Sequence, residues 1–176
     1  RKLLEILHAR AIELGAELCF SEEFDCKGAL PEADLVLAAD GIHSALRERF
    51  ADTFRPSIEW GKARFAWLGT TLPLEAFTFI FEKTEHGWFQ AHIYKFDDKT
   101  TTYIVETPEH VWKAHGLDSA GMDESIAFCE KLFADDLQGH KLMTNARHLR
   151  GSAWLNFQRI TCEQWSHFNG RAHVVL

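Results

Sequence analysis

The stretch "HGWFQAHIY", residues 86–94, alternates side chains in a way that could build a small-molecule site. If the stretch is one strand, alternate side chains point to the same face, and those on one face are His86, Trp88, Gln90, His92 and Tyr94. Polar groups that donate and accept hydrogen bonds, flanked by aromatic rings, suit an amphipathic aromatic ligand. The other interpretation is a solvated outer face, with Phe89 and Ile93 turned toward a core.

A second candidate site lies in "ADLVLAADGIHSALRERF", residues 33–50, where an apolar run stops at Asp40-Gly41. Folds of the α/β class bind ligands at the carboxyl edge of their parallel strands, and Gly41 lets the backbone turn sharply there. Asp40 can accept hydrogen bonds from a ribityl or ribose hydroxyl or orient backbone amides, while Ser44 can cap the next helix with Arg47 one turn in. An ordinary strand-turn-helix junction is the alternative.

The composition is that of a folded protein. The chain has 176 residues, of which 46% are hydrophobic, enough for one large domain or two small lobes. The net charge of -7 argues against nucleic acid as the main partner. The sequence has no apolar run of membrane-spanning length and no signal peptide, and its four cysteines show neither CxxC nor metal-ligand spacing. We therefore expect a cytoplasmic protein with reduced thiols, no membrane partner and no metal.

Basic residues concentrate toward the C-terminal end. From Leu137 onward, five Lys or Arg residues stand against the single acid Glu163, a local charge of +4, so the first 136 residues carry -11. A solvated basic face is the simpler interpretation. The sharper interpretation is a landing site for an anionic ligand, with Lys141, Arg147 and Arg150 as candidates.

Apolar spacing predicts an α/β segment in the first third of the chain. Residues 2–14 have helical spacing, and Gly15 fits the C-terminal cap. A short strand is predicted over residues 16–20 and a polar connection over residues 21–33. Residues 34–39 are apolar without alternation, which predicts a parallel strand covered on both faces.

From about residue 55 the sequence predicts an antiparallel sheet with helices. The segments rich in β-branched and aromatic residues are 63–72, 76–84, 87–96 and 100–107, and the second of them places Phe77, Phe79 and Phe81 on one face. Helices are predicted over 109–116 and over 123–137, the second capped by Asp123. Further strands are predicted over 154–165 and 173–176, the last of them buried on both sides. The predicted fold class is therefore α/β plus an antiparallel β-sheet (α+β) lobe.

The stretch "DLVLAADGIHSALR" resembles the second fingerprint of the flavoprotein aromatic hydroxylases of the p-hydroxybenzoate hydroxylase fold. Its matching positions are Asp34, Asp40, Gly41, Ser44 and Arg47. The opening "RKLLEILHARAIELGAEL" resembles the helix and strand before that fingerprint, where Arg1 corresponds to an arginine near the flavin. Residues 65–112 and 148–170 are similar to the substrate lobe of the salicylyl-CoA 5-hydroxylase and 2-aminobenzoyl-CoA monooxygenase group. The tryptophan-derivative hydroxylases of violacein synthesis resemble the chain more distantly.

This resemblance implies FAD and NAD(P)H as cofactors, and hydroxylation of an aromatic CoA thioester through a flavin C4a-hydroperoxide. It implies a partial FAD-binding α/β lobe over residues 1–54, a substrate-binding sheet lobe with helices over 55–170, and a strand returning to the first lobe over 171–176. The implied cofactor-binding residues are Arg1, Asp40, Gly41, Ser44 and Arg47. The candidate substrate-binding residues are His86, Trp88, Gln90, His92, Tyr94, Arg147 and Arg150, and no catalytic acid-base residue is needed.

Two departures from the family pattern are visible. The first fingerprint, GxGxxG, is absent from the 11 glycines of the chain, and the third is expected just after the final "VVL". We therefore expect an interior fragment of an enzyme, which works with the remainder of its own polypeptide and is inactive alone. Two alternatives stay open: a hydroxylase of a free indole or tryptophan derivative, and a non-catalytic module that binds an aromatic small molecule.

Overall fold

The computed structural model describes residues 2–144 and 154–176. The chain divides into two compact units, and each is described by itself. Unit 1 comprises Arg1–Pro56 and Cys162–Leu176, and unit 2 is Ser57–Thr161. No helix in the described ranges combines the length and the apolar character needed to cross a membrane.

Unit 1 contains a small sheet with the strand order β1-β11-β10. Its strands are β1 (Leu35–Leu37), β10 (Ser166–Phe168) and β11 (His173–Val175), and its helices are α1 (Lys2–Glu13), α2 (Ala45–Arg49) and α3 (Ala51–Phe54). β1 runs parallel to β11, with Val36 opposite the fully buried Val174, and β10 runs antiparallel to β11. The boundary predicted at residue 170 lies at residue 161 instead, because β10 pairs within unit 1.

Three expectations for unit 1 are corrected. Residues 16–20 are not a strand, because a strand needs a hydrogen-bonded neighbour and none of the described strands pairs with them. β1 is parallel as predicted, but Leu35 and Leu37 are 53% and 69% exposed, so this strand is not covered on both faces. The strand β11 is likewise buried at Val174 but exposed at His173. The apolar character of these strands therefore predicted more burial than the described residues show.

Gly15 ends α1 as predicted. Its φ of 82° is in the left-handed region, which glycine adopts without a steric penalty. The amide of Ala16 donates to the carbonyl of Ala11 at 3.0 Å, closing the last turn of the helix. The apolar side chains of α1 are nevertheless exposed, and none of its residues is buried.

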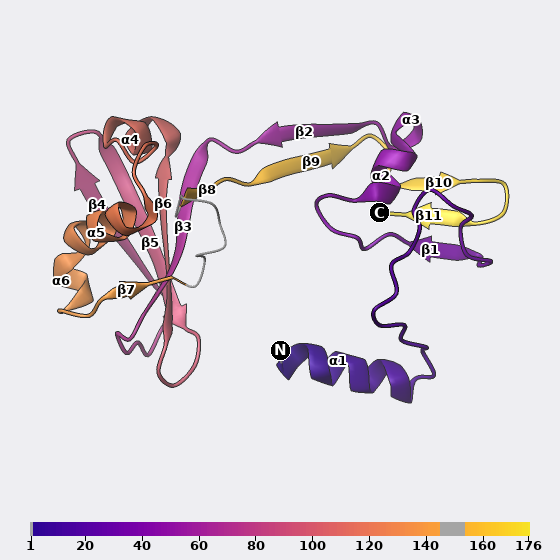
Figure 1. Ribbon diagram of the computed structural model, residues 1–176, viewed down its shortest axis with the longest axis horizontal. Coiled ribbons are helices and arrows are strands. Elements are labelled where there is room, and N and C mark those ends of the chain that lie inside the picture. The colour runs from indigo at the N-terminus through magenta and orange to yellow at the C-terminus, as the bar shows by residue number, and fades with distance from the viewer. Residues whose placement is uncertain (1, 145–153) are drawn as a thin grey trace. The chain divides into compact units, whose positions relative to one another are not determined.

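Unit 2 is built on a six-stranded sheet with the order β4-β5-β6-β3-β7, where β8 also pairs with β3 (Figure 1). The four long strands confirm the predicted antiparallel sheet. The strands are β3 (Ala63–Thr70), β4 (Thr78–Thr84), β5 (Gly87–Lys95), β6 (Thr101–Pro108), β7 (Leu142–Met143) and β8 (Trp154–Leu155). A separate two-stranded sheet pairs β2 (Pro56–Trp60) with β9 (Gln158–Cys162), so the predicted strand over 154–165 is divided.

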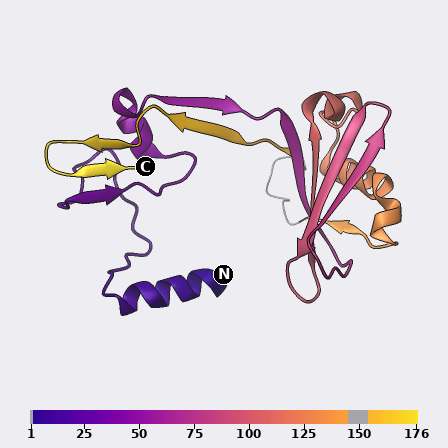
Figure 2. The same cartoon turned by 180° about the vertical axis from the view of Figure 1, so that it is seen from behind.

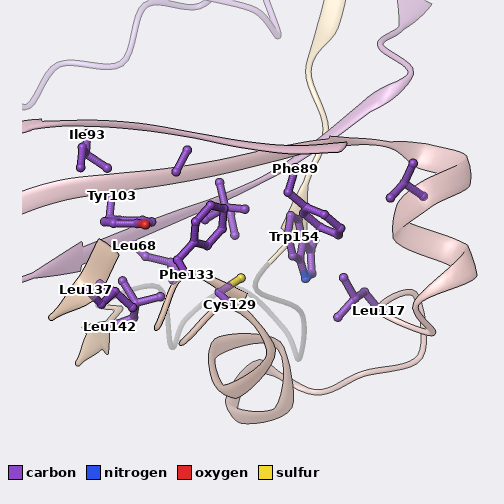
Figure 3. Close-up of a cluster of buried hydrophobic side chains, with 14 residues drawn as sticks. Leu68, Phe89, Ile93, Tyr103, Leu117, Cys129, Phe133, Leu137, Leu142 and Trp154 are labelled. Carbon is purple, nitrogen blue, oxygen red and sulfur yellow. The ribbon is translucent and has the colours of Figure 1, made fainter. Parts of the chain in front are cut away.

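Among the described residues of unit 2, helices cover one face of the large sheet, as Figures 1 and 2 show. They are α4 (Glu109–Ala114), α5 (Met122–Leu132) and α6 (Ala134–Leu137). Figure 3 shows Phe89, Tyr103 and Phe133 between the sheet and these helices, and all three are fully buried. Burying such aromatic side chains supplies much of the stabilisation of a small sheet domain.

Helix α5 (Met122–Leu132) begins one residue earlier than predicted. Its N-cap residue is Gly121, whose amide donates to the Glu124 carboxylate at 2.9 Å. The prediction that Asp123 caps this helix is wrong, since Asp123 lies within the first turn. There its negative charge still interacts favourably with the positive end of the helix dipole and stabilises the helix.

Candidate functional site

The face of the large sheet that the helices leave uncovered is rich in aromatic residues. On β5, the buried residues Phe89, Ala91 and Ile93 belong to the core. The alternate residues Trp88, Gln90, His92 and Tyr94 point to the opposite face, as the sequence predicted. We call this surface the open face. Its residues on the four long strands and at the start of β4 are Phe65, Trp67, Gly69, Phe77, Phe79, Phe81, Lys83, Trp88, Gln90, His92, Tyr94, Thr102, Ile104 and Glu106.

The phenylalanines of β4 and the polar residues of β5 lie on this same face. In the β4–β5 pair, Phe79 is opposite His92 and Phe81 is opposite Gln90, and directly opposite residues in an antiparallel pair share a face. The sequence placed each set on one face of its own strand without relating the two strands. They form one surface, because β4 and β5 are hydrogen-bonded neighbours.

Aromatic rings on the open face stack on one another while remaining accessible. The rings of Phe77 and Tyr94 are 5.5 Å apart and nearly parallel, at 5°. The ring of His92 lies 6.2 Å from Phe77 and 6.1 Å from Phe79. Phe77, Phe79 and Phe81 are 55–58% exposed. Exposed apolar side chains gathered in this way are typical of interaction surfaces, which makes the open face the candidate site.

His86 does not share the open face. It lies in the turn before β5, where Gly87 has a φ of 139° and breaks the strand alternation. Its ring packs at 4.8 Å against His115, whose own ring contacts the core residue Phe89 at 5.5 Å. Burial, reinforced by the neighbouring His86, lowers the pKa of His115. His86 therefore packs on the side of the sheet that the helices cover, and not on the open face.

Glu106 is a residue of the open face that sequence reasoning had not selected as a binding residue. It lies on β6 between Gln90 of β5 and Phe65 of β3. Its side chain is half-buried. The alternation of Thr102, Ile104 and Glu106 in "TTTYIVET" places Glu106 on one face of a strand. That pattern alone does not reveal that β6 lies beside β5.

The junction after β1 brings four of the five predicted cofactor-binding residues together. Asp40 Oδ2 accepts from the Leu46 amide at 3.2 Å, and Ser44 Oγ accepts from the Arg47 amide at 3.0 Å. Arg47 Nη2 donates to the Ile42 carbonyl at 2.6 Å. Partial burial opposes ionisation of Asp40, but hydrogen bonds from the Ser44 side chain and the Leu46 amide prevail and lower its pKa. In this structure, Asp40 therefore orients backbone amides. The fifth residue, Arg1, lies outside the described residues.

The backbone at this junction is open to a ligand. Gly41 has a φ of 84°, and a Cβ added there would meet nothing within 4 Å. A pocket of about 590 Å³ lies beside the junction. Its lining includes Phe24, Ala38, Ala39, Asp40 and His43.

The described cations of the basic C-terminal segment, residues 137–176, are paired with carboxylates. Lys141 Nζ lies 2.9 Å from Glu130, and Arg171 Nη2 lies 3.0 Å from Glu32. Arg159 pairs with Glu59. These pairs neutralise the local positive charge and favour the solvated-face interpretation. Arg147 and Arg150 lie outside the described residues.

Comparison with curated proteins relates the chain to monooxygenases that act on aromatic compounds. It is 35% identical over 173 residues to salicyloyl-CoA 5-hydroxylase from Streptomyces sp, covering 94% of this chain and 32% of the relative. It is 31% identical over 166 residues to 3-hydroxy-4-methyl-anthranilyl-[aryl-carrier protein] 5-monooxygenase from Streptosporangium sibiricum, covering 94% of this chain and 41% of that protein. Protodeoxyviolaceinate monooxygenase from Chromobacterium violaceum is 27% identical over 163 residues, covering 92% of this chain and 42% of that protein.

These relatives confirm the resemblance inferred from the sequence, including the more distant similarity to a violacein-pathway enzyme. The chain spans between about a third and two fifths of their length, as a fragment of an aromatic hydroxylase would. No family model matches it. Among solved structures, tetracycline destructase Tet(51) aligns over 81% of this chain and 36% of that chain, at 16% identity and a TM-score of 0.37. A similarity of that size does not define a shared fold.

Proposed function

We propose that this chain is part of an FAD- and NAD(P)H-dependent monooxygenase that hydroxylates an aromatic ring carried on a CoA thioester. The observation that supports this most is the open face, an accessible surface of stacked aromatic rings that surrounds Gln90 and His92. It belongs to a chain whose relatives include salicyloyl-CoA 5-hydroxylase. In this proposal unit 2 is the substrate-binding part of a p-hydroxybenzoate hydroxylase fold, and unit 1 is part of its FAD-binding domain.

The junction after β1 fits part of an FAD site. Bare space above Gly41 would let the cofactor approach the backbone closely. The carboxylate of Asp40 keeps accepting capacity for a ribityl or ribose hydroxyl while it holds the Leu46 amide. The glycine-rich loop that binds the pyrophosphate is absent from this sequence, so in this proposal other residues of the full-length protein supply it. When bound, the flavin supplies the oxygen-transfer chemistry.

The residues of this chain would bind and orient the ring. Phe77, Phe79 and Tyr94 offer flat apolar surfaces for stacking. Gln90 donates and accepts, and His92 does one or both according to its protonation, so together they can hold a ring hydroxyl or amine. Holding one ring carbon in a fixed position contributes to the rate, since a misplaced substrate reacts poorly. The exposed rings would also exclude water once the site is covered.

A second candidate function keeps the enzyme class but changes the group that carries the aromatic ring. One relative acts on an anthranilyl group attached to an aryl-carrier protein, and another is a protodeoxyviolaceinate monooxygenase. The described cations of the basic C-terminal segment are already paired, which weakens the case for a CoA phosphate site there. A carrier-protein-linked anthranilyl substrate is therefore the second candidate.

The experiment is to purify the full-length protein, record its flavin spectrum and measure NAD(P)H oxidation. The substrates are salicyloyl-CoA, 2-aminobenzoyl-CoA and the anthranilyl carrier-protein conjugate. The proposal expects bound FAD and thioester-stimulated oxidation with formation of a hydroxylated ring. A protein that purifies without flavin and cannot be reconstituted would favour the non-catalytic binding module instead.

A further inference from the structure

Glu106 is the single acidic residue among the open-face residues defined above. It lies near the middle of the sheet, on β6, with β5 on one side and β3 on the other. Gln90 is directly opposite it on β5 and Phe65 is opposite it on β3. Side chains that face each other in this way have Cβ atoms about 4.5–5.5 Å apart. A carboxylate, an amide and aromatic rings are thus grouped on one surface.

The Glu106 carboxylate has no ion-pair partner within residues 2–144 and 154–176, and it makes no hydrogen bond there. Two other acids of unit 2 do have partners. Glu109 contacts both Arg64 and Lys113, and Glu130 contacts Lys141. An unpaired, half-buried carboxylate among aromatic rings is costly unless something hydrogen-bonds to it. Gln90 also makes no hydrogen bond with any described residue. Both groups are therefore free to receive a ligand.

We propose that Glu106 accepts a hydrogen bond from the hydroxyl or amine on the substrate ring, which makes it a specificity-determining residue. This inference rests on the proposed function. The proton stays on the substrate oxygen or nitrogen, so the step is a hydrogen bond and transfers no proton. A carboxylate that accepts from a phenol or aniline draws the hydrogen toward itself and leaves more electron density on the ring. That enriches the ring carbons on which an electrophilic oxygen is placed.

The position of Glu106 would also fix the orientation of the substrate ring on the open face. Gln90 lies beside it, and His92 lies opposite Ile104, two residues before Glu106 on β6. A ring stacked on the phenylalanines of β4 would reach Glu106 across β5, past Gln90 and His92. The hydroxyl or amine on the substrate ring would then donate to the Glu106 carboxylate. A site built to hydrogen-bond a substrate group strongly rejects analogues that lack it.

The test compares the Glu106→Gln variant with wild type in the full-length protein, using isothermal titration calorimetry. The probes are salicyloyl-CoA and 2-aminobenzoyl-CoA, which carry a ring donor, and benzoyl-CoA, which carries none. We expect Glu106→Gln to weaken binding of the two donor-bearing thioesters by about tenfold or more and to change benzoyl-CoA binding less than twofold. The matched control is Glu82→Gln, since Glu82 lies opposite Phe89 and faces the helical side.

The possible results separate the inference from the function on which it rests. Equal affinities of wild type and Glu106→Gln for all three probes would overturn the role of Glu106 while leaving the hydroxylase proposal intact. An equal loss for benzoyl-CoA would also overturn it, because the effect would not depend on the donor. If Glu106→Gln does not fold, wild type still has to bind the donor-bearing thioesters about tenfold more tightly than benzoyl-CoA, and equal binding refutes the inference. Failure of wild type to bind any thioester contradicts the proposed CoA substrate, and the inference falls with it.

Discussion

His92 lies directly opposite Phe79 in the β4–β5 pair, with their ring centroids 6.1 Å apart. One residue brings a polar ring and the other an apolar ring to the same exposed surface. Since Gln90 and Phe81 repeat this arrangement two residues away, the open face offers both stacking and hydrogen bonding to one ligand.

Replacing His92 or Gln90 with Ala should uncouple the enzyme. Loss of one hydrogen bond to the substrate costs about 1–3 kcal/mol in positioning, and a misplaced ring is not hydroxylated although reduced nicotinamide is still consumed. The measurement is product formed per NAD(P)H oxidised in the full-length protein. His110→Ala is the control, because His110 is an exposed residue of α4. Coupling at the wild-type level in both variants would contradict the role of this face.

Phe79 and Phe89 should respond to truncation in opposite ways. Phe89 is fully buried, so Phe89→Ala should lower the free energy of unfolding by about 3–5 kcal/mol. Phe79 is 55% exposed, so Phe79→Ala should change it by about 0.5 kcal/mol or less while weakening substrate binding. Chemical denaturation and substrate titration of both variants check this. A Phe79→Ala protein with reduced stability and unchanged affinity would make Phe79 a structural residue.

Asp40→Asn should destabilise the protein near neutral pH and much less in acid. The pKa of Asp40 is lowered in the folded state, so its ionised form contributes stability above the ordinary carboxyl value of 3.8, and that contribution disappears as the pH falls through the lowered pKa. The difference at pH 7 should be below about 1 kcal/mol, since the carboxylate is exposed and screened by solvent. Thermal unfolding of wild type and variant from pH 7 to pH 3 tests this. A difference that grows as the pH falls would contradict it.

Lys141 and Arg147 should differ if any part of the basic segment binds CoA. Lys141 is paired with Glu130 at 2.9 Å, so Lys141→Ala should leave the KM for the thioester unchanged. Arg147→Glu should raise that KM without changing kcat, as the loss of uniform binding requires. The measurement is KM and kcat for the thioester in both variants by steady-state kinetics. An unchanged KM in Arg147→Glu and in Arg150→Glu would make the whole segment a solvated basic face.

Alternation within a strand explains why Trp88, Gln90, His92 and Tyr94 could be assigned to one face from the sequence. The same rule failed for His86, because Gly87 turns the chain at the end of the β4–β5 hairpin. Strand neighbours could not be predicted in this way. That Glu106 lies beside Gln90, and that Phe79 and His92 form one surface, follows from pairings that a single sequence does not specify.

The junction after β1 was predictable because its signals are local. An apolar strand, Asp40-Gly41 and the capping Ser44 occur within a few residues, and the predicted cap is present at 3.0 Å. Burial was harder to predict for the same unit. Leu35 and Leu37 have the composition of a covered strand, yet both are exposed here. An apolar strand pattern predicts the strand, but burial depends on which elements pack against it, and a local pattern does not specify those.

The most direct test of the central claim is oxygen labelling of the reaction product. The full-length protein is supplied with FAD, NAD(P)H, ¹⁸O₂ and salicyloyl-CoA or 2-aminobenzoyl-CoA, and the ring product is analysed by mass spectrometry. An aromatic monooxygenase should place one ¹⁸O atom on the ring of each product molecule. Recovery of unchanged thioester from a protein that carries its flavin, or a ring hydroxyl that holds only solvent oxygen, would contradict the account.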